Sequence, residues 1–221
     1  MVTALRWSTG GRAVAAATTA LLWGNVVLPR SGFGIRGRTV ANAAFATGYS
    51  TVFGGHPNWS STRGWRWGAA AFGAVGVGYA AAVAIARVRA RLVAVADQEP
   101  EVDVAEWVTI HIPLGTVYSE ETIFRGTLDP LLDEVAGPVG KWCGALIFGL
   151  WHIHPARAAG DSVAATLAAT AVGGLIFSWL RRRTGSATAP ALAHLALNAG
   201  GALAPRVARA VGNHSRSPSN P

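Results

Sequence analysis

The chain is poor in charged residues, in cysteine and, over its first part, in acids. Only 14% of its 221 residues are charged, whereas roughly 25% are charged in soluble globular domains. Its single cysteine, Cys143, cannot form an intramolecular disulfide. No acidic residue precedes Asp97, and all 11 acids lie between Asp97 and Asp161. With 51% hydrophobic residues, this composition indicates a chain whose main solvent is the lipid bilayer.

Two common hydrolase motifs are also missing. The sequence has no GxSxG, the turn that presents the nucleophile of many serine hydrolases. Cys143 precedes His152 by nine residues, about 180° around a continuous helix, which argues against a cysteine hydrolase. No HExxH occurs, which removes the common zincin signature but leaves other metal sites open.

The formal net charge of +8 comes from arginines and a single lysine, Lys141. These residues do not form one basic stripe with interleaved aromatics, so we expect no nucleic-acid partner. They bracket apolar runs instead, as at Arg6 and Arg12, a pattern typical of positive-inside topology signals. We predict that the clusters at 87–91 and 181–183 both mark cytoplasmic helix ends.

Long apolar runs predict an all-α fold, a polytopic transmembrane helical bundle with about six to seven spans. The first run precedes no clear small-residue cleavage site, so we expect a retained membrane helix rather than a signal peptide. Three runs approach the roughly 20 residues that cross a hydrocarbon core, and they lie at 13–29, 68–86 and 163–180. The shorter runs lie at 39–55, 107–119, 142–153 and 187–204.

An acidic linker at 97–106 divides the chain. We expect residues 1–96 to form N-terminal membrane-anchoring helices and residues 107–204 to form the membrane domain that carries the chemistry. The last part, 205–221, is rich in Ser, Pro, Asn and Arg and predicts a disordered tail.

Two features of the N-terminal part suggest how it meets the bilayer. Residues 56–67 contain three tryptophans and two arginines, which predicts an interfacial loop with aromatic anchors. The next apolar run contains Gly73, Gly76 and Gly78. Small residues let membrane helices approach closely, so we predict tight helix packing at these glycines.

Ionisable side chains stand within the apolar segments of the C-terminal half. Each costs roughly 2.5 to 3.5 kcal/mol at bilayer depth, so they require partners or a function. The first cluster reads EETIFR, and a four-residue helical step places Glu121 beside Arg125. Glu120 points about 100° away and is left to face another partner.

Two more apolar segments carry polar groups. Phe148 and His152 form an FxxxH pattern, and His154 lies about 200° around the helix from His152, so the two histidines do not chelate one metal. The pattern HxxxN places His194 and Asn198 one above the other on one helix face. Taken alone, such pairs can simply join two membrane helices by hydrogen bonds.

The order of these three motifs is similar to that of the CPBP family, the CAAX proteases and bacteriocin-processing proteins. EExxxR at 120–125, FxxxH at 148–152 and HxxxN at 194–198 follow one another on successive apolar segments. The resemblance covers residues 107–204, which it identifies as a CPBP-like catalytic membrane domain. It implies an all-helical membrane fold with a cavity that opens within the bilayer.

The resemblance implies an intramembrane endopeptidase in which four residues converge, namely Glu120, His152, His194 and Asn198. Glu120 is expected to act as general base on a water, while His152 positions that water or protonates the leaving amine. His194 and Asn198 are expected to donate hydrogen bonds to the oxyanion. The residues expected to organise the site are Glu121, Arg125 and Phe148.

Two alternatives stay open at this point. The same four residues are candidate ligands of a divalent metal such as zinc, which would make the protein a metalloprotease. A noncatalytic membrane protein, either an immunity or scaffold factor or a proton-coupled transporter, could also use buried Glu and His. The expected partners are the lipid bilayer and a peptide, prenylated or membrane-embedded, and the expected location is the bacterial plasma membrane, as a multi-pass protein.

Overall fold

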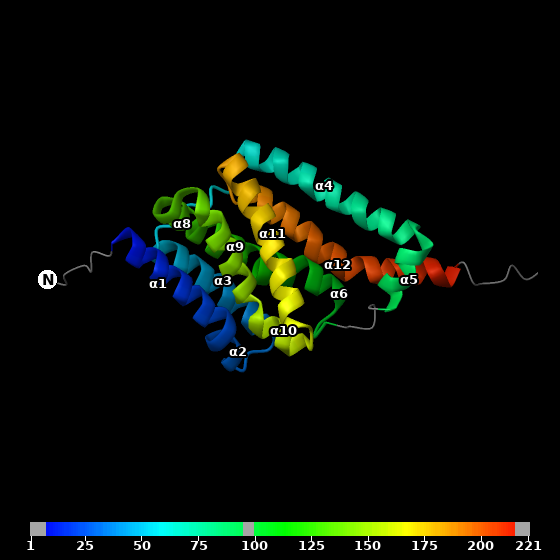
Figure 1. Cartoon of the computed structure of the whole chain (residues 1–221). Coiled ribbons are helices and arrows are strands. Elements are labelled where there is room, and N and C mark those ends of the chain that lie inside the picture. Colours follow the sequence, from blue (N-terminus) through cyan, green and yellow to red (C-terminus); the bar gives the residue numbers. More distant parts are fainter. Residues whose placement is uncertain (1–7, 95–99, 215–221) are drawn as a thin grey trace, which may run out of the picture.

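The computed structural model describes residues 8–94 and 100–214, and no β-strand occurs in these ranges. Seven helical passages pack side by side into one bundle (Figure 1). The predicted all-α membrane fold is confirmed.

The first half of the described chain builds three of these passages and one short helix. The first passage is helical throughout Thr9–Arg30, although its hydrogen bonding is π-helical for one turn. In chain order the elements are α1 (Thr9–Leu22), η1 (Trp23–Val27), α2 (Leu28–Arg30), α3 (Ile35–Val52), α4 (Thr62–Ala84) and α5 (Ala86–Ala94).

The second half supplies four passages. The first of them is helical without interruption over residues 104–136 and contains two π-helical stretches. In chain order the elements are α6 (Val104–Glu106), η2 (Trp107–Tyr118), α7 (Ser119–Ile123), η3 (Phe124–Leu128), α8 (Asp129–Ala136), η4 (Gly137–Val139), α9 (Gly140–Trp151), α10 (Ile153–Ala159), α11 (Val163–Thr184) and α12 (Thr188–His214).

Local sequence signals set the ends of the long helices. Ser61 and Ser162 are the N-caps of α4 and α11, and each hydroxyl accepts a hydrogen bond from a backbone N–H of the first turn. Gly185 ends α11 with a φ of 68°, a left-handed conformation that favours glycine. These signals fix where both helices begin and where α11 ends.

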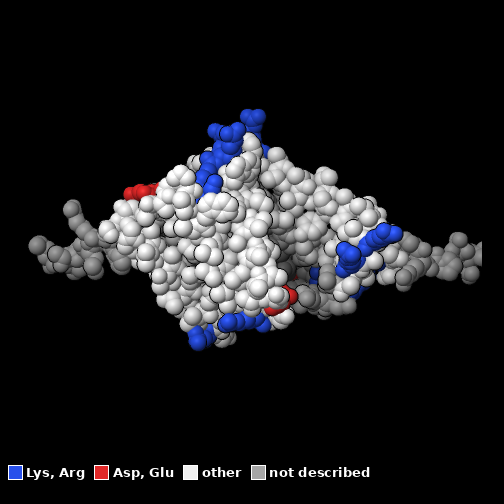
Figure 2. Space-filling model, viewed as in Figure 1, with Lys and Arg blue, Asp and Glu red and all other residues white. Residues whose placement is uncertain are grey.

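Among the described residues, three helices are long and apolar enough to cross a membrane by length and composition, namely Thr9–Arg30, Thr62–Ala84 and Val163–Thr184. They overlap the three long apolar runs predicted from the sequence. Large apolar side chains such as Val77 and Val172 point outward from them. In Figure 2 the face in view is mostly free of charged side chains, which gather at its edges. The chain is therefore an integral membrane protein.

α4 and α12 run parallel, side by side (Figure 1). Near the start of both helices, the Ser186 hydroxyl donates to the carbonyl of Asn58 over 2.8 Å. Farther along, the Tyr79 hydroxyl donates to the carbonyl of Leu197 over 2.9 Å. The end of α4 therefore lies far from the turn between α11 and α12.

This arrangement separates two arginine clusters that were predicted to share one side of the membrane. Residues 87–91 follow the end of α4, whereas the Arg183 guanidinium lies 5.5 Å from the ring of Trp67, near its start. A helix of 23 residues is about 34 Å long, so the clusters lie at opposite rims. The prediction that both mark cytoplasmic ends is wrong. The charges correctly mark two helix ends, but they do not reveal in which direction each helix crosses the bundle.

The glycines that allow close packing of α4 are not the predicted ones. A Cβ added to Gly73, Gly76 or Gly78 would meet nothing within 4 Å. A Cβ on Gly68 would lie 2.6 Å from the Leu192 side chain of α12. The close approach therefore occurs one to three turns earlier in α4, and the packing prediction for the three later glycines is wrong.

Three further boundaries differ from those predicted. α4 begins at Thr62, so the last part of the predicted loop 56–67 is helical, capped by Ser61. α12 continues to His214, so the first part of the predicted tail 205–221 is helical, and residues 215–221 lie outside the described residues. Of the predicted linker 97–106, residues 104–106 form α6 and residues 97–99 lie outside the described residues.

One hydrophobic core includes residues from both halves of the chain. Ala16 and Tyr49 from the N-terminal part pack in the same cluster as Phe124, Phe148 and Phe177. The N-terminal helices therefore form part of the wall around the centre of the bundle, in addition to any anchoring role.

Replacing Gly68 by Val should destabilise the bundle, because the added side chain overlaps Leu192 and overpacking typically costs about 1–3 kcal/mol. The matched control is Gly76→Val on the same helix, where the space is open. Thermal unfolding in detergent should show a lower midpoint for Gly68→Val than for Gly76→Val. Equal midpoints would contradict the close approach of α4 and α12.

Candidate active site

Three helices bring the predicted motifs to one buried region of the bundle. α7 carries Glu120 and Glu121, α9 carries Phe148, and α12 carries His194, and each is exposed by less than a tenth. His194 Nδ1 lies 2.8 Å from Glu121 Oε1, and His194 Nε2 lies 3.9 Å from Glu120 Oε2. Two adjacent glutamates of one helix therefore face the two nitrogens of a single imidazole.

The local backbone around these glutamates is unusual. α7 is a short α-helical segment between the π-helical stretches η2 and η3. The Ser119 and Thr127 hydroxyls each donate to a carbonyl five residues earlier, on either side of the glutamates. π-Helical turns are uncommon and frequently occur at functional sites.

Glu121 and Arg125 form an ion pair with no exposed side-chain surface. Arg125 Nε lies 3.5 Å from Glu121 Oε2, one helical step away, as the EExxxR spacing predicts. The guanidinium lies 4.4 Å from the ring centre of Phe148 and 5.3 Å from that of Phe177. Aromatic faces attract cations, so the cage stabilises a charge that water cannot reach.

The bond to Glu121 decides the proton position on His194. An ionised carboxylate can only accept hydrogen bonds, so Nδ1 carries the proton that it donates to Glu121. The imidazole also stacks on Phe177, with ring centres 4.8 Å apart and an interplanar angle of 26°. The ring is thereby held with Nε2 toward Glu120.

Glu120 has one bound oxygen and one free oxygen. Trp151 Nε1 donates to Glu120 Oε1 over 3.2 Å. Glu120 Oε2 is buried and has no hydrogen-bond partner among the described residues. Buried polar atoms are nearly always paired, so an unpaired carboxylate oxygen beside an imidazole is a place for a water or a substrate atom.

His152 and Asn198 lie at the edge of this arrangement. His152 ends α9, its Nδ1 donates to the Phe148 carbonyl over 2.8 Å, and its ring meets the Phe148 ring edge-on at 4.9 Å. Among the described residues, no hydrogen bond or ring contact joins His152 to Glu120 or to His194. Asn198 is half-buried, one turn after His194 on α12. Phe148 is the shared neighbour that separates His152 from His194.

A buried acid that no motif included adjoins the site. Asp129 is fully buried, its Oδ2 accepts from the Ser178 hydroxyl over 2.6 Å, and its Oδ1 has no partner among the described residues. It stands four residues after Arg125, so it continues the helical ladder that begins at Glu121. Pro130 follows it at the start of α8, where proline is tolerated in the first turn of a helix. The four-residue spacing was the signal that could have identified it.

Trp151 and Phe177 also border the site without belonging to a motif. Both lie in apolar helices, where their spacing is that of ordinary core residues. Only the packing of α9 and α11 against α7 and α12 gives them contacts with charged groups. No sequence signal distinguishes them.

The residues present do not fit a metal site with three protein ligands. Among the described residues, no three His, Cys, Asp or Glu side chains lie close enough together to hold one ion. Glu120 Oε2 and His194 Nε2 supply two donors, and the other His194 nitrogen is taken by Glu121. Catalytic zinc sites use three protein ligands plus water. Among the described residues, Glu120 and His194 fall one protein ligand short of that set.

Comparison with known proteins identifies the same part of the chain. Residues 104–200 match the family described as type II CAAX prenyl endopeptidase Rce1-like. The match includes every residue of the three motifs and confirms the family predicted from their order. No curated protein and no solved structure matches the chain.

Arg125→Met should lower the free energy of unfolding by about 3–5 kcal/mol, because it leaves the Glu121 charge buried without a counter-ion. Adding Glu121→Gln removes that charge, so the double variant should be more stable than Arg125→Met alone. Unfolding in detergent measures both. Arg87→Met, at an exposed arginine, is the control and should stay near the wild type. A double variant less stable than Arg125→Met would contradict the ion pair.

Proposed function

We propose that the chain, whose residues 104–200 belong to the type II CAAX prenyl endopeptidase Rce1-like family, is an intramembrane endopeptidase. It hydrolyses a peptide bond with a water that Glu120 activates. The observation that carries this proposal is the pair of adjacent glutamates around His194, with one Glu120 oxygen buried and unpaired among the described residues.

Glu120 acts as the general base. A water next to its free oxygen donates one hydrogen bond to Oε2 and lies beside His194 Nε2. As the water oxygen bonds to the carbonyl carbon of the substrate, Glu120 takes the proton and the carbonyl oxygen becomes an oxyanion. Trp151 holds the other Glu120 oxygen, so the base keeps one orientation during the transfer.

His194 and Asn198 stabilise the oxyanion. Glu121 accepts the hydrogen bond from Nδ1, so Nε2 faces the space beside Glu120, where in its protonated form it donates to the oxyanion. The Asn198 amide, one helical turn away on the same face of α12, supplies a second donor. Donors fixed before the reaction in a site without bulk water contribute several kcal/mol to transition-state stabilisation.

His152 positions the water in this mechanism. Its Nδ1–H donates to the Phe148 carbonyl, which leaves Nε2 as the ring nitrogen that can contact the water. When the intermediate collapses, the carbon–nitrogen bond breaks and the leaving nitrogen takes the proton held by Glu120. The carboxylate is thereby restored for the next turnover.

Arg125 and its aromatic cage organise the site. Arg125 lies beside the Glu121 carboxylate as its counter-charge, and Phe148 and Phe177 exclude water from the pair. Asp129, bound by Ser178, adds a second carboxylate one turn beyond Arg125. We assign these residues to positioning His194 rather than to contact with the substrate.

The substrate that fits this setting is a peptide presented by the membrane. The site is buried in a bundle with an apolar exterior, which favours a membrane-embedded or lipid-modified peptide over a soluble one. A prenylated cysteine near the cleaved bond is the modification that the family description suggests. The proposed location is the plasma membrane of a bacterium.

Glu120→Gln should abolish cleavage, with a loss of about 10²- to 10⁴-fold or more, because an amide cannot take the proton from water. The measurement is cleavage of prenylated CAAX peptides and of unmodified membrane peptides by the purified protein in nanodiscs. Metal content is measured on the same samples.

Glu134→Gln is the control for this prediction, since it removes an exposed carboxylate at the end of α8. If folded Glu120→Gln cleaved the peptides at the wild-type rate, Glu120 would not be the general base. If the folded wild type cleaved no peptide of the panel, the result would favour a noncatalytic membrane protein, either an immunity or scaffold factor or a transporter.

Trp151→Phe should lower kcat about 10- to 100-fold with a smaller change in KM, because it removes one hydrogen bond that orients Glu120 while the ring packing remains. Trp142→Phe, at an exposed tryptophan on the same helix, should leave both constants near the wild type. Equal kinetics for the two variants would show that the Trp151 hydrogen bond does not orient the base.

A further inference from the structure

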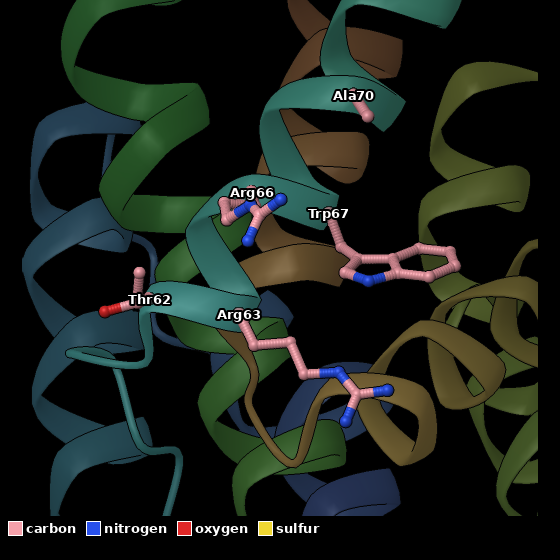
Figure 3. A pocket seen from close by; sticks show the side chains of 5 residues that line it. All are labelled: Thr62, Arg63, Arg66, Trp67 and Ala70. Carbon is pink, nitrogen blue, oxygen red and sulfur yellow. The ribbon is translucent and has the colours of Figure 1, made fainter.

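A cavity lies away from the active site, at the rim where α4 begins and α11 ends. Its volume is about 680 Å³. Figure 3 shows the side chains that line it, which all come from the first turns of α4. They are Thr62, Arg63, Arg66, Trp67 and Ala70.

The cavity is strongly basic. Arg63 and Arg66 are exposed and form no ion pair with an acid among the described residues. Arg183, from the end of α11, lies with its guanidinium 5.5 Å from the Trp67 ring centre. The two preceding arginines, Arg181 and Arg182, both form ion pairs with Asp133, whereas Arg183 forms no ion pair with an acid among the described residues. Figure 2 shows basic side chains gathered at this rim, over the start of α4 and the end of α11.

Two tryptophans place the cavity at the edge of the hydrocarbon layer. The rings of Trp67 and Trp179 meet edge-on, with centres 5.7 Å apart. Each stands five residues inside the outer end of its membrane-crossing helix, α4 or α11, which is about 7.5 Å along the axis. Tryptophan rings concentrate at the headgroup level of a bilayer. The arginines therefore lie at the depth of the lipid phosphates, and Ala70 lies deeper.

We propose that this cavity binds the phosphate headgroup of an anionic phospholipid from the surrounding leaflet. The guanidinium groups of Arg63 and Arg66 offer the forked donors that match phosphate oxygens. Trp67 packs against the glycerol region, and the small side chain of Ala70 leaves a path for an acyl chain along α4. Basic side chains clustered at the end of a membrane helix attract anionic lipid headgroups. This proposal does not depend on the proposed proteolytic activity.

A bound lipid would act on the packing of three helices. Arg63 and Trp67 belong to α4, Trp179 and Arg183 to α11, and Gly64 of α4 packs on Ser186 at the start of α12. A phosphate shared between the arginines of α4 and Arg183 would hold α4 against α11. The bundle should therefore unfold at a higher temperature when an anionic lipid is present.

The test uses the full chain in nanodiscs of phosphatidylcholine with and without phosphatidylglycerol, with thermal unfolding and lipids retained in native mass spectrometry as readouts. The wild type should retain phosphatidylglycerol selectively and gain thermal stability from it. Arg63→Gln/Arg66→Gln should weaken retention about tenfold or more and lose most of the stabilisation. Its midpoint in phosphatidylcholine alone checks the fold.

Arg87→Gln/Arg91→Gln is the matched control, since it removes two exposed arginines at the opposite end of α4. It should retain phosphatidylglycerol within about twofold of the wild type, because exposed charges farther away than the Debye length of about 10 Å are largely screened. If both double variants lost phosphatidylglycerol retention equally, the effect would be general charge attraction, and the proposed binding site would be wrong. If soluble glycerol phosphate stabilised the wild type as much as phosphatidylglycerol does, the proposal that the bound phosphate belongs to a membrane lipid would be wrong.

Discussion

The ion pair of Glu121 and Arg125, shut off from water, is the interaction on which the rest of the site depends. A carboxylate buried in a membrane protein stays ionised only beside a counter-charge, and Arg125 supplies it at one helical step. Because Glu121 is charged, it fixes the proton on His194 Nδ1 and turns Nε2 toward Glu120. The orientation of the imidazole thus follows from a pair that touches neither water nor substrate.

Phe148 explains why three separate motifs converge on this pair. Its ring contacts the Arg125 guanidinium, the His152 ring and the His194 ring. A smaller side chain would leave a gap beside a buried cation, and water entering that gap would weaken the pair. The FxxxH spacing thus joins an aromatic wall to a histidine at the end of the same helix, where the chain leaves α9.

The sequence allowed the membrane helices and the Glu121 and Arg125 pair to be predicted, because both depend on local spacing. Apolar runs mark helices at any position in the fold, and a four-residue step joins two side chains of one helix whatever surrounds it. Trp151 and Phe177 were missed, since their contacts arise only when α7, α9, α11 and α12 pack together. The packing glycines of α4 were misplaced for the same reason, because the position of α12 decides which face is covered. Asp129 was missed although its four-residue spacing from Arg125 is a local signal. The roles of Glu120, His152, His194 and Asn198 in catalysis stay predictions.

Because α4 and α12 run parallel, the number of helical passages between them is constrained. Two neighbouring helices with the same direction require an odd number of passages between them, and the three passages within residues 104–184 meet that requirement. Adding or deleting one passage would invert α12. His194 would then approach α7 from the opposite rim and could not face both glutamates. A single buried histidine between two carboxylates therefore limits how many times the chain can turn between α4 and α12.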